Sequence, residues 1–136
     1  MTPEEMARFI DKDQFARFLG VEVLDQGPDA ARVRLTILPH HLNSAGTVHG
    51  GAIFSLADAA FAVASNSHGP LSMAINVSIA YFTAATGGTL YAEAEEVSLA
   101  PKLATYLIRV TDETGRRIAL FQGTVYRKTE RAAPGE

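Results

Sequence analysis

The stretch that decides the fold reads HGGAIFSLADAAFAVASNSHG, residues 49–69. Two glycines follow its first residue, six alanines keep it slim, and its large apolar side chains point in nearly every direction around a helix. A helix that is apolar on all sides is a buried helix, and this one is too short to cross a membrane. Its only carboxylate is Asp58. The sequence therefore raises one question: why a buried helix carries an aspartate.

Length and composition limit the classes of protein to which this chain can belong. A chain of 136 residues is long enough to bury a core, and we expect one domain over residues 1–136. The net charge of −3 argues against a general nucleic-acid binder. The first residues show no basic segment leading into an apolar run, and the chain has no cysteine. We therefore expect no signal peptide, no disulfide and, by default, a cytoplasmic location.

The remaining chain predicts a helical segment followed by strands. Apolar residues at helical spacing after the Thr2-Pro3 start indicate one helix or two short ones over residues 3–19, ending at Gly20. Phe15, Phe18 and Leu19 are expected to continue the apolar stripe of this segment. Alternation of apolar and polar residues then predicts strands around positions 21–37, 71–81, 89–99, 103–111 and 117–128, with a bulge near Glu95-Glu96. The tail, 129–136, is expected to fray.

Segregated helices and strands indicate an α+β domain with an antiparallel sheet. A flat sheet covers only one face of a helix. We therefore expect the sheet to curve around the helix of residues 49–69, and the remaining face of that helix to need another partner.

Gly50 and Gly51 open the central helix, where backbone N–H groups lack intrahelical partners and the helix dipole is positive. Such an end suits an anion or a carbonyl oxygen that becomes anionic, although a tight turn explains the glycines equally well. Asp58 is either a carboxylate held by a cationic or N–H partner, or a base or nucleophile whose pKa is raised by desolvation.

The spacing of these residues adds a constraint. Eight residues at 1.5 Å rise separate Gly50 from Asp58 by roughly 12 Å along one helix. Two groups that act on one reacting centre must each lie about 3 Å from it. If both act on one substrate, the glycine must come from one chain and the aspartate from another, across a two-fold interface.

The loop before the helix holds weaker candidates. Asn43 could hydrogen-bond a water or a carbonyl, but a bond to its own loop backbone is the better interpretation of the residue alone. His49 is expected to orient the loop. No carboxylate lies at metal-ligand spacing from the histidines, so we expect no metal site.

At HLN-x5-HGG-x6-D, the sequence resembles the acyl-CoA thioesterases of the hotdog fold, within the phenylacetic-acid-degradation subgroup. The pattern comprises His41-Leu42-Asn43, His49-Gly50-Gly51 and Ala52 through Asp58, and the likeness runs from about Phe18 to Lys128. It implies a curved antiparallel sheet around one long central helix, in dimers that share a continuous sheet and pair again as tetramers.

The resemblance also implies roles for site residues. Asp58 would activate water or attack the thioester, the Gly50 N–H of the partner subunit would polarise the carbonyl, and Asn43 would position carbonyl or water. Gly51 and His49 would contact the substrate. Some relatives carry a serine that holds the attacking water where this chain has Ala74, so a water held in that way is not carried over.

The implied substrate is an aryl (phenylacetyl-like) or medium-chain acyl-CoA, with no separate cofactor. Arg127 and Lys128 are the cations we prefer for its phosphates. Pocket size is expected to depend on the packing of Phe54, Phe61, Tyr81 and Phe82. Two alternatives stay open: a hotdog enoyl-CoA hydratase, and a non-enzymatic acyl-CoA sensor. Neither a nucleic acid nor a membrane is expected as a partner.

Overall fold

The computed structural model describes residues 2–131, with side chains as far as Lys128. The elements follow the predicted order, and their bounds are α1 (Pro3–Asp11), α2 (Gln14–Leu19), β1 (Glu22–Asp25), β2 (Arg32–Thr36), a 3-10 turn η1 (Pro39–His41), α3 (Gly50–Asn66), β3 (Pro70–Tyr81), β4 (Thr89–Leu99), β5 (Leu103–Thr111) and β6 (Arg117–Arg131).

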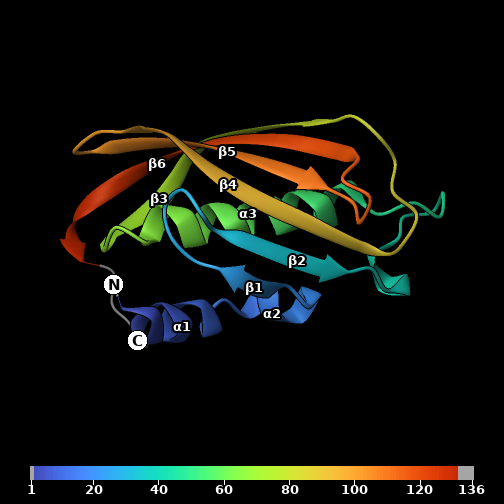
Figure 1. Ribbon diagram of the computed structural model, residues 1–136, viewed down its shortest axis with the longest axis horizontal. Helices are drawn as coiled ribbons and strands as arrows, with labels where there is room; N and C mark the ends of the chain where they lie inside the picture. Colours follow the sequence, from blue (N-terminus) through green and yellow to red (C-terminus); the bar gives the residue numbers. More distant parts are fainter. Residues whose placement is uncertain (1, 132–136) are drawn as a thin grey trace.

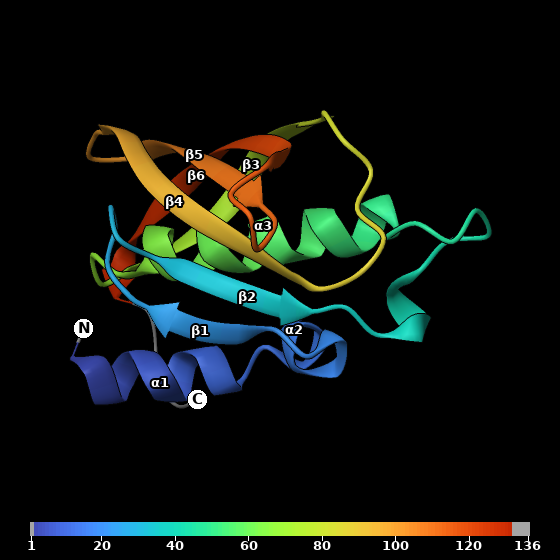
Figure 2. The same ribbon diagram turned by 45° about the vertical axis from the view of Figure 1, so that its right-hand side comes forward.

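The strands form one antiparallel sheet in the order β1-β2-β4-β5-β6-β3. The sheet arches over α3, and α1 and α2 lie beside β1 on the open side of the arch (Figures 1 and 2). Segregated helices and a curved sheet around one long helix confirm the predicted α+β architecture.

The core lies between α3 and the concave face of the sheet. The Phe61 ring packs against Phe121 and Tyr106, with ring centroids 5.4 and 6.0 Å away. A side chain at position 123 would leave no room for this packing, because a Cβ built on Gly123 would lie 2.6 Å from the Phe61 Cζ atom. Gly123 therefore lets β6 pass close enough to α3 for the sheet to curve around it.

The N-terminal segment is two helices because it holds two caps. The Thr2 hydroxyl accepts the Glu5 N–H at 3.1 Å, and the Asp13 carboxylate accepts the Ala16 N–H at 3.0 Å. The expectation that Phe15 and Phe18 continue the apolar stripe of the first helix is wrong. They are 61% and 77% exposed, because the second cap starts a helix with a different orientation.

Two strand details extend the prediction. The register of β4 against β5 shifts between Glu96 and Ser98, next to the expected bulge. β6 continues to Arg131, three residues into the expected tail, because Arg131 pairs with Pro70 of β3. The rest of that tail, 132–136, lies outside the described residues.

β3 is a long edge strand with one unpaired side. Met73, Ile75 and Tyr81 on this strand are 54%, 60% and 50% exposed. Long apolar edges are templates for pairing with another chain, and isolated proteins usually blunt them with charges or bulges. The twelve residues of β3 contain no charged residue, and its register shifts against β6 lie in its first half, between Pro70 and Ser72 and between Ala74 and Asn76. The strand thus has the properties of an interface.

Candidate active site

The loop between η1 and α3 is fixed by buried histidine contacts. His41 is 2% exposed, its Nδ1 accepts the Leu38 N–H at 2.9 Å, and its Nε2 bonds the Leu19 carbonyl at 2.8 Å. The His41 carbonyl in turn accepts the His49 N–H at 2.8 Å. These bonds join α2, the loop and the start of α3, and so place the first turn of α3 firmly.

Three of the first four N–H groups of α3 are satisfied by His49. The Gly51 N–H donates to His49 Nδ1 at 2.8 Å, and the Ala52 and Ile53 N–H groups donate to the His49 carbonyl at 2.9 and 3.2 Å. Among the residues that the structure describes, nothing accepts the remaining N–H, that of Gly50. The first turn therefore presents one free donor at the positive end of the helix dipole.

Tyr81, the last residue of β3, holds Gly50 in place. Its hydroxyl donates to the Gly50 carbonyl at 2.9 Å, and a Cβ on Gly50 would lie 3.3 Å from that hydroxyl oxygen. The sequence predicted Tyr81 as a strand residue but not this contact. Tyr81 was expected to influence pocket size, and it shares the strand parity of Val77 and Ile79, which pack against the core.

The structure pairs the predicted substrate-binding residues Gly51 and His49 with each other. The imidazole Nδ1 caps the helix, and a Cβ on Gly51 would lie 2.9 Å from that nitrogen. A glycine at position 51 is therefore needed for the cap itself. The orienting role predicted for His49 fits this geometry, while the Gly51 N–H is already engaged.

Asn43 organises its own loop. Its side-chain oxygen accepts the Ala45 and Thr47 N–H groups at 3.0 and 3.1 Å, and its amide donates to the Thr47 hydroxyl at 2.9 Å. In the single chain, Asn43 therefore bonds to its own loop, which is the interpretation favoured for the residue alone. Asn43 shapes the loop that leads to Gly50.

Asp58 lies on the strip of α3 that the sheet leaves uncovered, with Gly51 and Ser55 on the same side. The expectation of a buried carboxylate is wrong for the single chain, where Asp58 is exposed, because the arch of the sheet covers only the other sides of the helix. Even so, loss of solvent around the side chain raises the pKa of Asp58, and the charge of Asp13 raises it further. Asp13 was not among the predicted site residues.

Two hollows flank this strip of α3. A groove of about 810 Å³ includes Ala59 and Ala62, and a smaller cavity of about 390 Å³ includes Gly51 and Ser55. Asp58 lies between these two pairs along the helix. A substrate that spans both hollows would pass the carboxylate.

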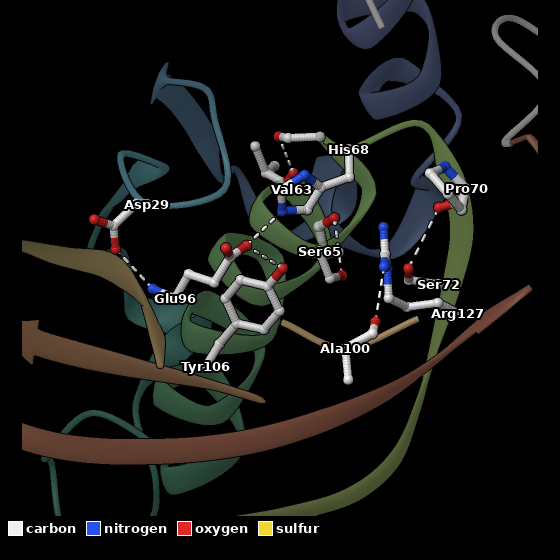
Figure 3. A network of polar contacts seen from close by, with 12 residues as sticks. Asp29, Val63, Ser65, His68, Pro70, Ser72, Glu96, Ala100, Tyr106 and Arg127 are labelled. Carbon is white, nitrogen blue, oxygen red and sulfur yellow. Dashed lines mark hydrogen bonds and ion pairs between the residues drawn. The ribbon is translucent and has the colours of Figure 1, made fainter. Parts of the chain in front are cut away.

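The polar cluster at the other end of α3 is structural. Glu96 Oε2 contacts His68 Nε2 at 2.5 Å and accepts the Tyr106 hydroxyl at 2.8 Å, while the Glu96 N–H donates to Asp29 at 2.7 Å (Figure 3). Burial and the hydrogen bond to the Glu96 carboxylate raise the pKa of the Tyr106 hydroxyl. Glu96 thus joins the end of α3 to β5 and the β1–β2 turn.

The two residues predicted to bind the CoA phosphates, Arg127 and Lys128, lie in different environments. Arg127 is half-buried, its Nη1 donates to the Ala100 carbonyl at 2.8 Å, and its Nε is buried with no partner among the described residues. Figure 3 shows the side chain turned into the fold beside Ser72. Lys128 is exposed. Lys128 is therefore the more accessible of the two cations.

The sequence model of the thioesterase superfamily matches residues 45–119, which include Gly50, Asp58 and Tyr81. The chain belongs to the thioesterase superfamily. Its sheet and central helix are the hotdog fold, and the protein is a thioester hydrolase.

Among known proteins, this thioesterase is similar to the acyl-coenzyme A thioesterase PaaI of Escherichia coli. The two are 32% identical over 118 residues, which cover 86% of this chain and 84% of the relative. A solved structure of E. coli PaaI superposes with a TM-score of 0.87 at 31% identity, over 93% of each chain. A mutant of the phenylacetic acid degradation protein PaaI from Thermus thermophilus superposes with a TM-score of 0.81 at 42% identity, over 85% of this chain and all of that one.

No helix within residues 2–131 is both long and apolar enough to cross a membrane. No group of three or more metal-ligating side chains in that part of the chain is placed to hold a metal ion.

Proposed function

We propose that the thioesterase hydrolyses an aryl or medium-chain acyl-CoA to the free acid and CoA, in a site shared by two copies of the chain. One observation carries the proposal. The free Gly50 N–H and the raised-pKa carboxylate of Asp58 lie on the same continuous helix. Eight residues separate them by about 12 Å, so the two groups of one chain cannot meet at one carbonyl.

The proposed partner is a second copy docked along β3 and the uncovered strip of α3. Antiparallel pairing of the two β3 edges would extend the sheet and cover Ile75. It would also bring the start of one α3 toward the middle of the other. The resemblance of the sequence motif to hotdog thioesterases implies dimers of this kind, and further pairing into tetramers stays a prediction.

In the proposed mechanism Asp58 acts as a general base. Its carboxylate takes a proton from a water molecule, whose oxygen attacks the thioester carbonyl carbon. The carbonyl oxygen becomes anionic and accepts a hydrogen bond from the Gly50 N–H of the partner subunit. When the C–S bond breaks, the CoA thiolate takes the proton from Asp58. The acid and the thiol leave, and the carboxylate is restored.

We propose water rather than the Asp58 carboxylate as the attacking nucleophile, in keeping with the role of a general base. Tyr81 supports the same step indirectly, because its bond to the Gly50 carbonyl fixes the direction of the Gly50 N–H. CoA itself is the leaving group of the substrate, so the mechanism needs no cofactor. Lys128 is the cation we propose for the CoA phosphates.

The pH dependence of thiol release tests the proposal. A general base works only when deprotonated, and the pKa of Asp58 is raised. We therefore expect kcat/KM for acyl-CoA hydrolysis to rise with pH through an inflection above about 3.9, the ordinary value for aspartate. Rates are measured from the released thiol, with blanks lacking enzyme and with aliquots returned to neutral pH to confirm that the protein stays intact. A rate that falls as the pH rises through this range would contradict the role of Asp58.

A further inference from the structure

The larger of the two hollows beside α3 is roofed by the N-terminal helices. Its roof includes Ile10 of α1 and Ala16 of α2, and its floor includes Ala62 and Val63 of α3. Its sides come from the two edges of the sheet, with Val21 and Val23 around β1, and with Leu71, Met73 and Ala74 on β3. We call this space the α1–α3 groove.

The α1–α3 groove begins beside the proposed reacting centre. Ala59 follows Asp58 directly, Ala62 lies one helical turn further on, and both line the groove. When the thioester carbonyl lies beside Asp58, the group bonded to its carbon can therefore extend directly into the groove. From Ala59 to Asn66, the last α3 residue in its lining, the floor runs about 10 Å along the helix.

The chemistry of the groove suits an apolar chain. Its floor consists of alanine and valine side chains, while the charged residues of its lining, Asp11, Lys12, Asp13 and Arg17, are all exposed. At the far end, Asn66 accepts the Ser72 N–H at 3.0 Å and donates to the Ala62 carbonyl at 2.9 Å. The side-chain amide of Asn66 is thus bonded at both its oxygen and its nitrogen, and it does not call for a polar ligand group.

We propose that the α1–α3 groove binds the acyl chain, and that the preferred substrates carry a saturated chain of medium length. With C–C bonds of about 1.5 Å, a floor of about 10 Å accommodates a chain of roughly eight carbons. A phenylacetyl group is shorter and leaves the Asn66 end empty. This inference rests on the proposed thioesterase site and chooses between its two acyl classes.

The inference also relocates the specificity-determining residues. From the sequence, Phe54, Phe61, Tyr81 and Phe82 are expected to set the size of the pocket. Phe61 is 2% exposed and packed in the core, and none of the four lines the α1–α3 groove. Ile10 and Ala16 of the N-terminal helices take that role, because their side chains form the wall opposite α3.

A matched pair of α2 variants tests the inference. Ala16→Phe places a ring in the groove, whereas Gln14→Phe places the same ring on an exposed position of the same helix outside its lining. Thiol release is measured with butyryl-, octanoyl- and phenylacetyl-CoA, and oligomer size by size-exclusion chromatography with light scattering. In the wild type we expect kcat/KM for octanoyl-CoA to exceed that for phenylacetyl-CoA about 10-fold or more.

In Ala16→Phe we expect the octanoyl-to-butyryl ratio of kcat/KM to fall about 10-fold, while Gln14→Phe keeps the wild-type ratio. An unchanged ratio in Ala16→Phe, with butyryl-CoA still hydrolysed, would overturn the inference and leave the proposed function standing. A changed oligomer size in Ala16→Phe alone would also overturn it, by showing that a second copy fills the groove. A wild type that releases thiol from none of the three would refute the proposed function itself.

Discussion

Asp58→Asn is expected to lower kcat for acyl-CoA hydrolysis by about 10²–10⁴-fold, the range that a general base contributes. Asparagine keeps the shape of the side chain but cannot take a proton from water. Substrate binding depends on other groups, so we expect KM to change far less than kcat. The measurement is steady-state thiol release with octanoyl-CoA at neutral pH, and turnover at the wild-type rate would contradict the assignment.

The stability of the same variant serves as its control. Because the folded-state pKa of Asp58 is raised, the folded protein binds this proton more tightly than the unfolded chain, and stability falls as the pH rises through the raised pKa. At neutral pH the charged carboxylate therefore opposes folding. We expect Asp58→Asn to have a Tm at pH 7 equal to or above that of the wild type, and the difference to vanish below about pH 3.9. If Asp58→Asn loses activity but retains its Tm, the defect lies in the chemical step and not in folding.

Gly50→Pro is expected to lower kcat by about 10²–10³-fold, the effect of removing one oxyanion-hole donor. Proline has no N–H group, and the first position of a helix tolerates it because that N–H has no intrahelical partner. The residue before a proline must be extended, and His49 already is, with φ −60° and ψ 134°. The substitution thus deletes the one free donor and keeps the backbone path.

Gly50→Ala is the matched control for that substitution. It places a Cβ at the same distance from the Tyr81 hydroxyl, 3.3 Å, but it keeps the N–H. We expect Gly50→Ala to retain most of the activity that Gly50→Pro loses, with kcat measured on the same substrate. Equal losses in the two variants would show that contact with Tyr81, and not the donor, is what matters at this position.

The sequence predicted the fold well where its periodicity was clear. The alternation along positions 71–81 is the observed β3, and the slim apolar stretch of residues 49–69 is the observed α3. The roof of the groove was harder to predict. Phe15 and Phe18 are three residues apart, which is a helical spacing, yet the cap at Asp13 starts a separate helix that carries them. A local cap leaves hydrophobic spacing unchanged.

The candidate site was predicted as a set of residues but not as an arrangement. Gly50 and Asp58 follow from the motif and from helical rise. The free N–H of Gly50 depends on His49 taking the Gly51 N–H, and the exposure of Asp58 depends on which side of α3 the sheet leaves open. Arg127 had the charge for phosphate binding, but strand parity turns it inward beside Ser72. Such features arise from contacts between segments that are far apart in the chain. These contacts cannot be recognised from a single sequence.

Mixing two inactive variants tests the shared site most directly. Asp58→Asn and Gly50→Pro chains are unfolded together, refolded at equal amounts and assayed for thiol release, with each variant refolded alone as the control. In a mixed dimer, one of the two sites combines the Asp58 of one chain with the Gly50 N–H of the other. Random pairing then predicts recovery of about a quarter of wild-type activity. Mixed dimers that form, as shown by native mass spectrometry, and recover no activity would contradict a site built from two chains.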